Sequence, residues 1–248
     1  MYVLGLILSV AIGVSLGLLG GGGSILTVPI LLYVFGASEH QAIATSLFVV
    51  GTTSGIGALQ HARRGNVNFR VGMLFGIASM IGAFAGARVG SHLPGQLLLG
   101  LFAAMMLLTA GAMLRKRREP AQVSQSQRGV AWIIVDGLLV GAFTGMVGAG
   151  GGFLVVPALA VLGKLPIRQA MGTSLMVICF KSFAGFAGYV TSVELSWTLS
   201  LSVTVAAVAG TFIGTRMAHV WSPESLRRSF GYFVLAMAIY ILLRELVF

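Results

Sequence analysis

The sequence predicts an all-α integral membrane protein built from two homologous repeats, each with three long transmembrane helices and one glycine-rich segment. Three observations support this fold class. Hydrophobic residues make up 57% of the chain and charged residues only 9%, whereas soluble domains carry about 25% charged residues. Eight apolar runs approach the ~20 residues that cross a bilayer as a helix. The chain also repeats itself after a shift that lays residue 17 on residue 145.

The eight apolar runs are the expected membrane helices. They span residues 2–19, 42–62, 71–87, 97–114, 130–147, 169–190, 199–215 and 230–243. The first run has no basic residue before it and no small-residue cleavage signature, so we expect a retained helix and not a signal peptide. The single Cys179 excludes an intrachain disulfide, and its apolar surroundings are typical of a packing thiol.

The internal duplication is visible without gaps. The stretch GLLGGGGSILTVP, residues 17–29, aligns with GMVGAGGGFLVVP, residues 145–157. The same shift aligns QAIATSL, residues 41–47, with QAMGTSL, residues 169–175. A register held over so long a stretch indicates two copies of one structural unit.

The domain organisation follows from this duplication. We place the first repeat at 1–114, a linker at 115–128 and the second repeat at 129–248. The linker carries five basic residues and one acid, which predicts a cytoplasmic location. Loop 61–70 has three arginines and is expected in the cytoplasm, whereas the matching loop 190–196 has one acid and is expected outside. Matching loops on opposite sides indicate an inverted-topology repeat.

Inversion requires an odd number of crossings in each half, so each glycine segment must add none or two. We favour a helical hairpin with a glycine tip inside the membrane. Residues 25–36 form an outgoing arm of about 18 Å, well short of the ~30 Å hydrocarbon core. A single broken helix, which would make the halves parallel, is the alternative.

The two glycine tracts are the first candidate binding elements. Non-helical backbone is tolerated at membrane depth only in the protein interior or along a cavity, and free N–H groups at a helix start favour an anion. The substrate-binding candidates in the tracts are Gly20, Gly21, Gly22, Gly23, Ser24, Gly148, Ala149, Gly150, Gly151 and Gly152. Close helix packing is the alternative, and it is our prediction for four other glycines: Gly82, Gly86, Gly210 and Gly214.

Hydroxyl side chains recur at matched positions of the two halves. These are Thr45 and Ser46 in the first half, and Thr173 and Ser174 in the second. Such hydroxyls can donate to an oxyanion, or they can bond the carbonyls of the preceding helical turn. Both interpretations stay open.

Lys181 lies deep within an apolar run that contains no acid. An ionisable residue at this depth is a functional hypothesis. With its neighbour Ser182, Lys181 is a candidate anion contact; it can also snorkel or pair with Asp136, the only acid inside an apolar run. Asp136 is therefore a candidate for carrying a coupling proton or for pairing with Lys181. The first half has Thr53 at the position that matches Lys181, so the two halves are chemically different.

The duplicated glycine–proline stretches and the QA-x-x-TSL boxes resemble the TauE/SafE family of sulfite exporters and related anion transporters. The resemblance covers nearly the whole chain. It implies movement of small sulfur-containing anions, such as sulfite, thiosulfate or sulfonates, across a bacterial inner membrane by a multi-pass protein. A homodimer is compatible with this expectation, and membrane lipid is an expected partner.

Other functions fit less well. The net charge of +10 resides largely in short loops, the pattern of loops facing anionic lipid, so we expect no nucleic-acid partner. An intramembrane hydrolase would need an activated serine, but Ser182 and Lys181 point about 100° apart on a helix. A cation or metal transporter would need carboxylates or histidines in the spans, and only Asp136 qualifies. We predict no metal, no cofactor and no catalytic residue.

Overall fold

The computed structural model describes residues 2–19, 22–114, 130–148, 167–217 and 223–247, and the single residues 155, 159 and 165. These described residues form helices and short connections, with no strand among them. The helices are α1 (Tyr2–Leu19), the 3-10 helix η1 (Gly22–Leu26), α2 (Thr27–Tyr33), α3 (Glu39–Arg63), α4 (Phe69–Gly90), α5 (Gly95–Leu114), α6 (Val130–Val147), α8 (Ile167–Tyr189), α9 (Trp197–Met217) and α10 (Pro223–Val247).

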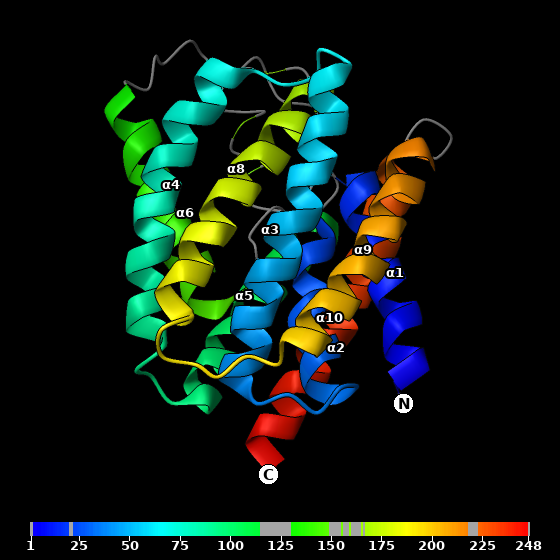
Figure 1. Cartoon of the computed structure of the whole chain (residues 1–248), viewed down its shortest axis with the longest axis vertical. Helices are drawn as coiled ribbons and strands as arrows, with labels where there is room; N and C mark the ends of the chain where they lie inside the picture. The colour runs from blue at the N-terminus through cyan, green and yellow to red at the C-terminus, as the bar shows by residue number, and fades with distance from the viewer. Residues whose placement is uncertain are drawn as a thin grey trace.

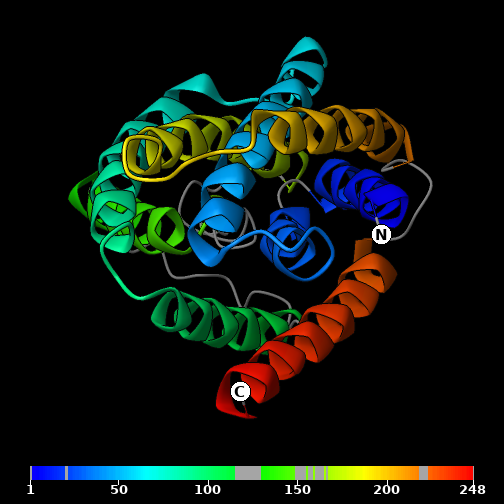
Figure 2. The same ribbon diagram turned by 60° about the horizontal axis from the view of Figure 1, so that its bottom comes forward.

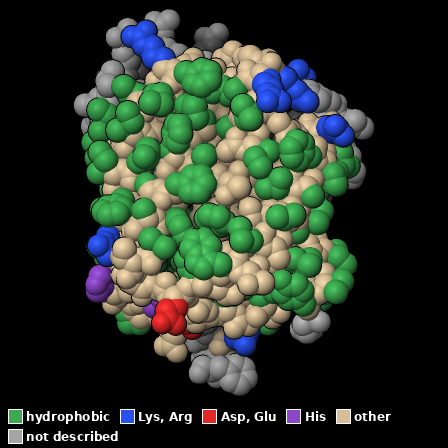
Figure 3. Space-filling view, in the orientation of Figure 1, with side chains coloured by type: hydrophobic (Ala, Val, Ile, Leu, Met, Phe, Trp, Pro, Cys, Tyr) green, Lys and Arg blue, Asp and Glu red, His purple; other side chains and the backbone are tan. Residues whose placement is uncertain are grey.

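The long helices coincide with the predicted apolar runs. In the described part of the chain, four helices (α3, α4, α8 and α9) are long and apolar enough to cross a membrane. Large apolar side chains face outward, including Leu108 at 76% and Val205 at 71% exposure. Figure 3 shows these side chains over the flank of the molecule and the charged side chains toward its two ends. An apolar flank between charged ends confirms the prediction of a helical membrane protein.

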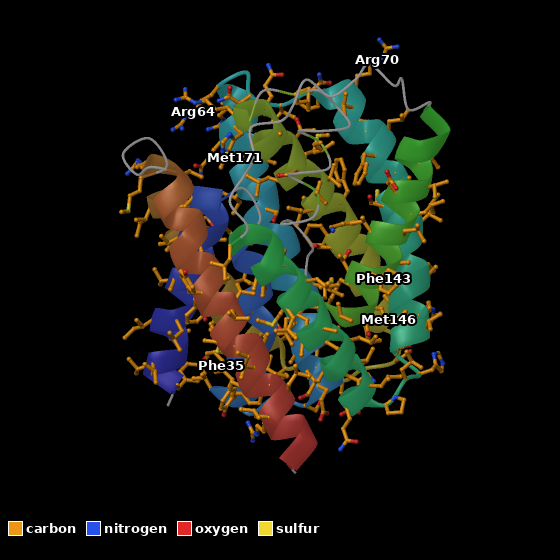
Figure 4. The ribbon with its side chains drawn as sticks, turned by 180° about the vertical axis from the view of Figure 1, so that it is seen from behind. Phe35, Arg64, Arg70, Phe143, Met146 and Met171 are labelled. Atoms are coloured by element: carbon orange, nitrogen blue, oxygen red, sulfur yellow. The ribbon has the colours of Figure 1, made fainter. Side chains whose placement is uncertain are left out.

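Helices α3 and α8 run antiparallel to each other through the bundle (Figure 1). At one end, the Gln41 amide donates to the Glu194 carbonyl oxygen over 2.9 Å. At the other end, the Asn68 backbone N–H donates to Thr173 Oγ1 over 2.9 Å. Helix α3 therefore ends where α8 begins, and the loops after them lie at opposite ends. Figure 4 shows Arg64 and Arg70 together at one of these ends.

Glycines of both repeats lie at close contacts between the two halves. Helix α1 packs against α9, and α4 packs against α6. A methyl group at Gly13 would overlap the Ala207 carbonyl, and one at Gly141 would overlap the Ser79 carbonyl. The shift that relates the two repeats lays Gly13 on Gly141 and Ser79 on Ala207, so the two contacts are equivalent.

The prediction of packing roles for the four other glycines is confirmed. Each would place a side chain against a neighbouring backbone carbonyl: Gly82 against Leu138, Gly86 against Ala142, Gly210 against Val10 and Gly214 against Val14. Small residues of this kind let helix backbones approach closely in a membrane.

The first glycine segment forms a hairpin. The Tyr2 and Phe35 rings meet edge to face with centroids 5.6 Å apart, so the chain returns to the end at which α1 begins. The outgoing arm consists of η1 and the short α2, and residues Thr27 to Leu31 of α2 are buried. Figure 2 shows α2 and α3 inside the bundle, with α5 and α10 side by side on one face. The first half therefore contains the predicted hairpin and not a single broken helix.

Candidate functional site

Lys181 is the central feature of the candidate site. Its side chain is only 1% exposed although it lies on a membrane-length helix. The Lys181 ammonium donates to Thr144 Oγ1 on α6 over 3.1 Å. Thr144, itself buried, donates its own proton to the Val140 carbonyl over 2.7 Å and is thereby fixed as an acceptor toward the lysine.

No carboxylate neutralises this lysine within the described residues. Asp136 lies on the same helix as Thr144 but eight residues earlier, about 12 Å along the helix axis. No ion pair joins the described side chains of Lys181 and Asp136, so the pairing interpretation is not supported. Snorkelling is also contradicted, because the ammonium bonds inside the bundle and not at its ends. An ammonium has three hydrogens to donate, and within the described part of the chain Thr144 accepts one of them.

Ser46 connects α3 of the first half to the glycine tract of the second. Its buried hydroxyl donates to the Gly148 carbonyl over 2.8 Å. Gly148 follows the last residue of α6 and has a φ of +71°, a left-handed conformation that glycine adopts readily. The hydrogen bond therefore fixes the start of the second tract. Ala149, Gly150, Gly151 and Gly152 lie outside the described residues.

Thr144 and Ser46 approach the second tract from different helices. Val155 and Leu159, which follow the tract, pack in one buried cluster with Val177 of α8. Lys181 lies one turn beyond Val177 on the same helix. Lys181 is thus on α8, the helix against which Val155 and Leu159 pack. Its acceptor Thr144 lies one turn before Gly148.

The described part of the first tract is packed and not open. A side chain at Gly23 would come within 2.7 Å of the Leu16 amide nitrogen, the Ser15 hydroxyl and the Ile12 carbonyl of α1. Helix α1 therefore lies directly against the Cα of Gly23, so a packing role accounts for this glycine, and its role in anion binding stays a prediction. Ser24 is fully buried within the 3-10 helix η1, which begins at Gly22. Gly20 and Gly21 lie outside the described residues.

The other matched hydroxyls have structural contacts. Thr45 Oγ1 lies 3.4 Å from Ser200 Oγ on α9. Thr173 accepts the Asn68 backbone N–H at the start of α4. Ser174 donates to the Met171 carbonyl in its own helix over 2.7 Å, which matches the back-bonding alternative. Ser46, in contrast, donates to the carbonyl of Gly148 at the start of the second glycine tract.

Ser182 does not form a dyad with Lys181. Its hydroxyl is buried and has no hydrogen-bond partner among the described residues, so the lysine does not act on it. The described residues also contain no group of three or more His, Cys, Asp or Glu that could hold a metal ion. Sequence reasoning missed Thr144, which occupies the position matched by Leu16; a polar residue where the other repeat is apolar was the available signal.

The fold and the buried lysine define a helical membrane protein with an ionisable group in its interior. A family profile described as "Sulfite exporter TauE/SafE" matches residues 5–241. The chain belongs to the TauE/SafE family.

Relatives of similar length come from distant organisms. A "Probable membrane transporter protein" of Xylella fastidiosa is 36% identical over 94% of this chain and 92% of its own length. The "Probable membrane transporter protein YdhB" of Bacillus subtilis is 30% identical over 84% of this chain and 87% of its own. One from Methanocaldococcus jannaschii is 27% identical over 98% of this chain and 97% of its own. No solved structure matches the chain.

Proposed function

We propose that this protein is a secondary transporter of small sulfur-containing anions, of the sulfite, thiosulfate or sulfonate type, in a bacterial inner membrane. The observation that carries the proposal is the Lys181 ammonium, buried within the bundle with a single hydroxyl acceptor. A cation at this depth is expensive unless a counter-charge reaches it. The described residues supply none, so an anion entering the site provides it.

We place the anion site at Lys181 and its partner Thr144, which lies one helical turn before Gly148. Thr144 orients the ammonium, and the Ser46 hydroxyl donates a hydrogen bond to the Gly148 carbonyl. An oxyanion accepts hydrogen bonds from an ammonium and from backbone N–H groups, which the tract following Gly148 would donate. The sulfur chemistry of the anion comes from the family description and not from these contacts.

The first half does not offer the same site. The positions matching Lys181 and Thr144 hold Thr53 and Leu16. Thr53 donates to the Val49 carbonyl of its own helix over 2.7 Å. The proposed site at Lys181 therefore has no counterpart at the matching positions of the first half.

Anion binding to purified variants tests this function. Lys181→Met keeps the apolar stem and removes the charge. We expect sulfite, thiosulfate or methanesulfonate to bind at least about 30-fold more weakly, because truncating one partner of a buried charged pair costs about 2 kcal/mol or more. Arg88→Gln, at an exposed arginine near the end of α4, is the matched control and should bind normally.

Two results would contradict the proposal. Normal affinity in Lys181→Met, with uptake into proteoliposomes unchanged, would remove Lys181 from the site. Recovery of binding in Lys181→Met with Asp136→Asn would instead assign the lysine to neutralising Asp136. Asp136 alone remains our candidate for proton coupling, and Asp136→Asn should then abolish the dependence of uptake on a pH gradient.

We also propose that the two repeats span the membrane with inverted topology. The opposite directions of α3 and α8 and the equivalent contacts at Gly13 and Gly141 support it. In a Cys179→Ala background, single cysteines placed in loops 61–70 and 190–196 should react with an impermeant maleimide from the cytoplasm and the periplasm respectively. Reaction of both loops from one side would exclude inversion.

A further inference from the structure

A groove of about 260 Å³ lies on the outer surface where α3, α8 and the start of α4 meet. Its lining is apolar and includes Ala58, Phe69, Met176 and Cys179. Leu59 and Phe69 at its rim are 53% and 60% exposed, so the groove opens toward lipid. A closed apolar cavity of about 150 Å³ holds a benzene ring, so this groove has space for a larger apolar group.

The other half of the molecule shows what the same location contains when it is filled. Four groove residues match aromatic residues after the repeat shift: Gly55 matches Phe183, Ala58 matches Phe186, Phe69 matches Trp197 and Met176 matches Phe48. The four aromatic side chains pack together, with centroids 5.3 Å apart for Phe48 and Phe186 and 5.9 Å apart for Phe48 and Trp197. Three rings of that cluster are thus missing in the groove: Gly55 and Ala58 leave their positions open, and Met176 replaces the third ring.

Among the described residues no side chain fills this space, and in the membrane the neighbouring solvent is lipid. Atoms lining a void lose dispersion contacts on the open side, and the surrounding solvent at this depth is hydrocarbon. An acyl chain offers flexible methylene groups that fit between Gly55, Ala58 and Phe180. In the other half the aromatic side chains occupy the corresponding space themselves.

The charge around the groove selects the headgroup. Arg63 follows the lining residue Ala62, and Arg70 follows the lining residue Phe69. Both arginines are exposed, and Figure 4 shows Arg70 at the same end as Arg64. Near the aromatic cluster the connecting loop carries Glu194 instead. The groove therefore has basic residues at its rim, and basic residues at the membrane surface attract anionic lipid.

We propose that the groove binds one acyl chain of an anionic phospholipid whose headgroup lies at Arg63 and Arg70. The lipid replaces the rings that Phe183 and Phe186 supply in the other half. Binding of this lipid is independent of the transported anion, because the groove opens outward and Lys181 is enclosed within the bundle.

Photolabelling in liposomes tests the proposal. Phosphatidylglycerol with a diazirine in its acyl chain should label α3 and α8 at the groove, as mapped by peptide mass spectrometry. Ala58→Phe adds the ring that its matching residue Phe186 provides, and should lower this labelling at least fivefold. Leu108→Phe, which adds a ring at a lipid-facing position of α5, should leave it unchanged. Where Ala58→Phe does not fold, Ala62→Leu narrows the same groove.

The headgroup is tested by comparing this probe with phosphatidylcholine carrying the same acyl chain. Replacing Arg63 and Arg70 by Gln should lower the preference for phosphatidylglycerol roughly fivefold for each arginine. Undiminished groove labelling in folded Ala58→Phe, or equal labelling of the wild type by both lipids, would overturn the proposal.

A second copy of the chain is the competing occupant, and Cys179 distinguishes it. Cys179 is the only cysteine in the chain and lines the groove. Two chains meeting groove to groove would form a disulfide between their Cys179 residues when membranes are treated with a mild oxidant. Efficient disulfide dimers would overturn lipid occupancy, and monomers with groove labelling support it.

Discussion

Ser46→Ala tests whether the first repeat holds the glycine tract of the second. The Ser46 hydroxyl is fully buried and donates to the Gly148 carbonyl over 2.8 Å. Carbonyls at a helix C-terminus lack partners within the helix, and Gly148 directly follows α6. Removing the hydroxyl leaves this carbonyl without the serine donor in a buried position.

The expected loss of stability follows from this geometry. Losing the donor to a buried carbonyl costs about 1–3 kcal/mol. For a chain of this size each kcal/mol lowers Tm by about 2–4 °C, so Ser46→Ala should melt several degrees below the wild type. Anion affinity should fall as well, because Gly148 begins the tract next to Thr144 and Lys181.

Thermal unfolding and anion binding are measured on the same purified protein. Ser9→Ala is the matched control: Ser9 is equally buried, but its hydroxyl bonds the Gly5 carbonyl within its own helix. That carbonyl also receives a backbone N–H in a regular helix, so the control should change little. Equal effects of Ser46→Ala and Ser9→Ala would refute the reasoning about Gly148.

Two further substitutions test the packing of the bundle. Tyr189→Phe removes the hydrogen bond from a buried tyrosine to the Met146 carbonyl, and we expect a loss of about 1–2 kcal/mol, read as a lower Tm; an unchanged Tm would contradict this. Gly141→Ala places a methyl group on the Ser79 carbonyl and should lower folded yield and Tm, whereas Gly100→Ala meets open space and should not; equal behaviour of the two alanines would exclude the close approach.

The sequence predicted the helices well because apolar runs of membrane length have few other structures available. The repeat shift also located the packing glycines, since Gly82 and Gly210 occupy equivalent contacts. It did not predict that Gly23 packs against α1. A glycine that admits a ligand and a glycine that admits a helix look the same in sequence, and only the position of the neighbouring backbone distinguishes them.

The hydrogen-bond partner of Lys181 could not be predicted from the sequence for a related reason. Helical spacing alone left Asp136 as a possible partner, because both residues lie in apolar runs. In the structure the Lys181 ammonium instead donates to Thr144, which lies two turns after Asp136 on α6. Sequence distance within one helix was readable, but the register between α6 and α8 depends on the packing of both against α4.

The asymmetry between the halves is the feature with the largest functional consequence. Duplicated backbones supply two equivalent frameworks, and substitution at matched positions then makes them different. Lys181 and Thr144 replace Thr53 and Leu16, so the cation belongs to one half only. At the outer surface Ala58 and Gly55 stand at the positions of Phe186 and Phe183, so the groove in the first half corresponds to an aromatic cluster in the second. Under the proposed function an anion would meet the single charge of Lys181, whereas an exact repeat would offer two cations that repel each other in a medium of low dielectric constant. A single buried cation satisfies one bound anion without the repulsion of a second, and this is the physical reason to expect one anion per protein chain.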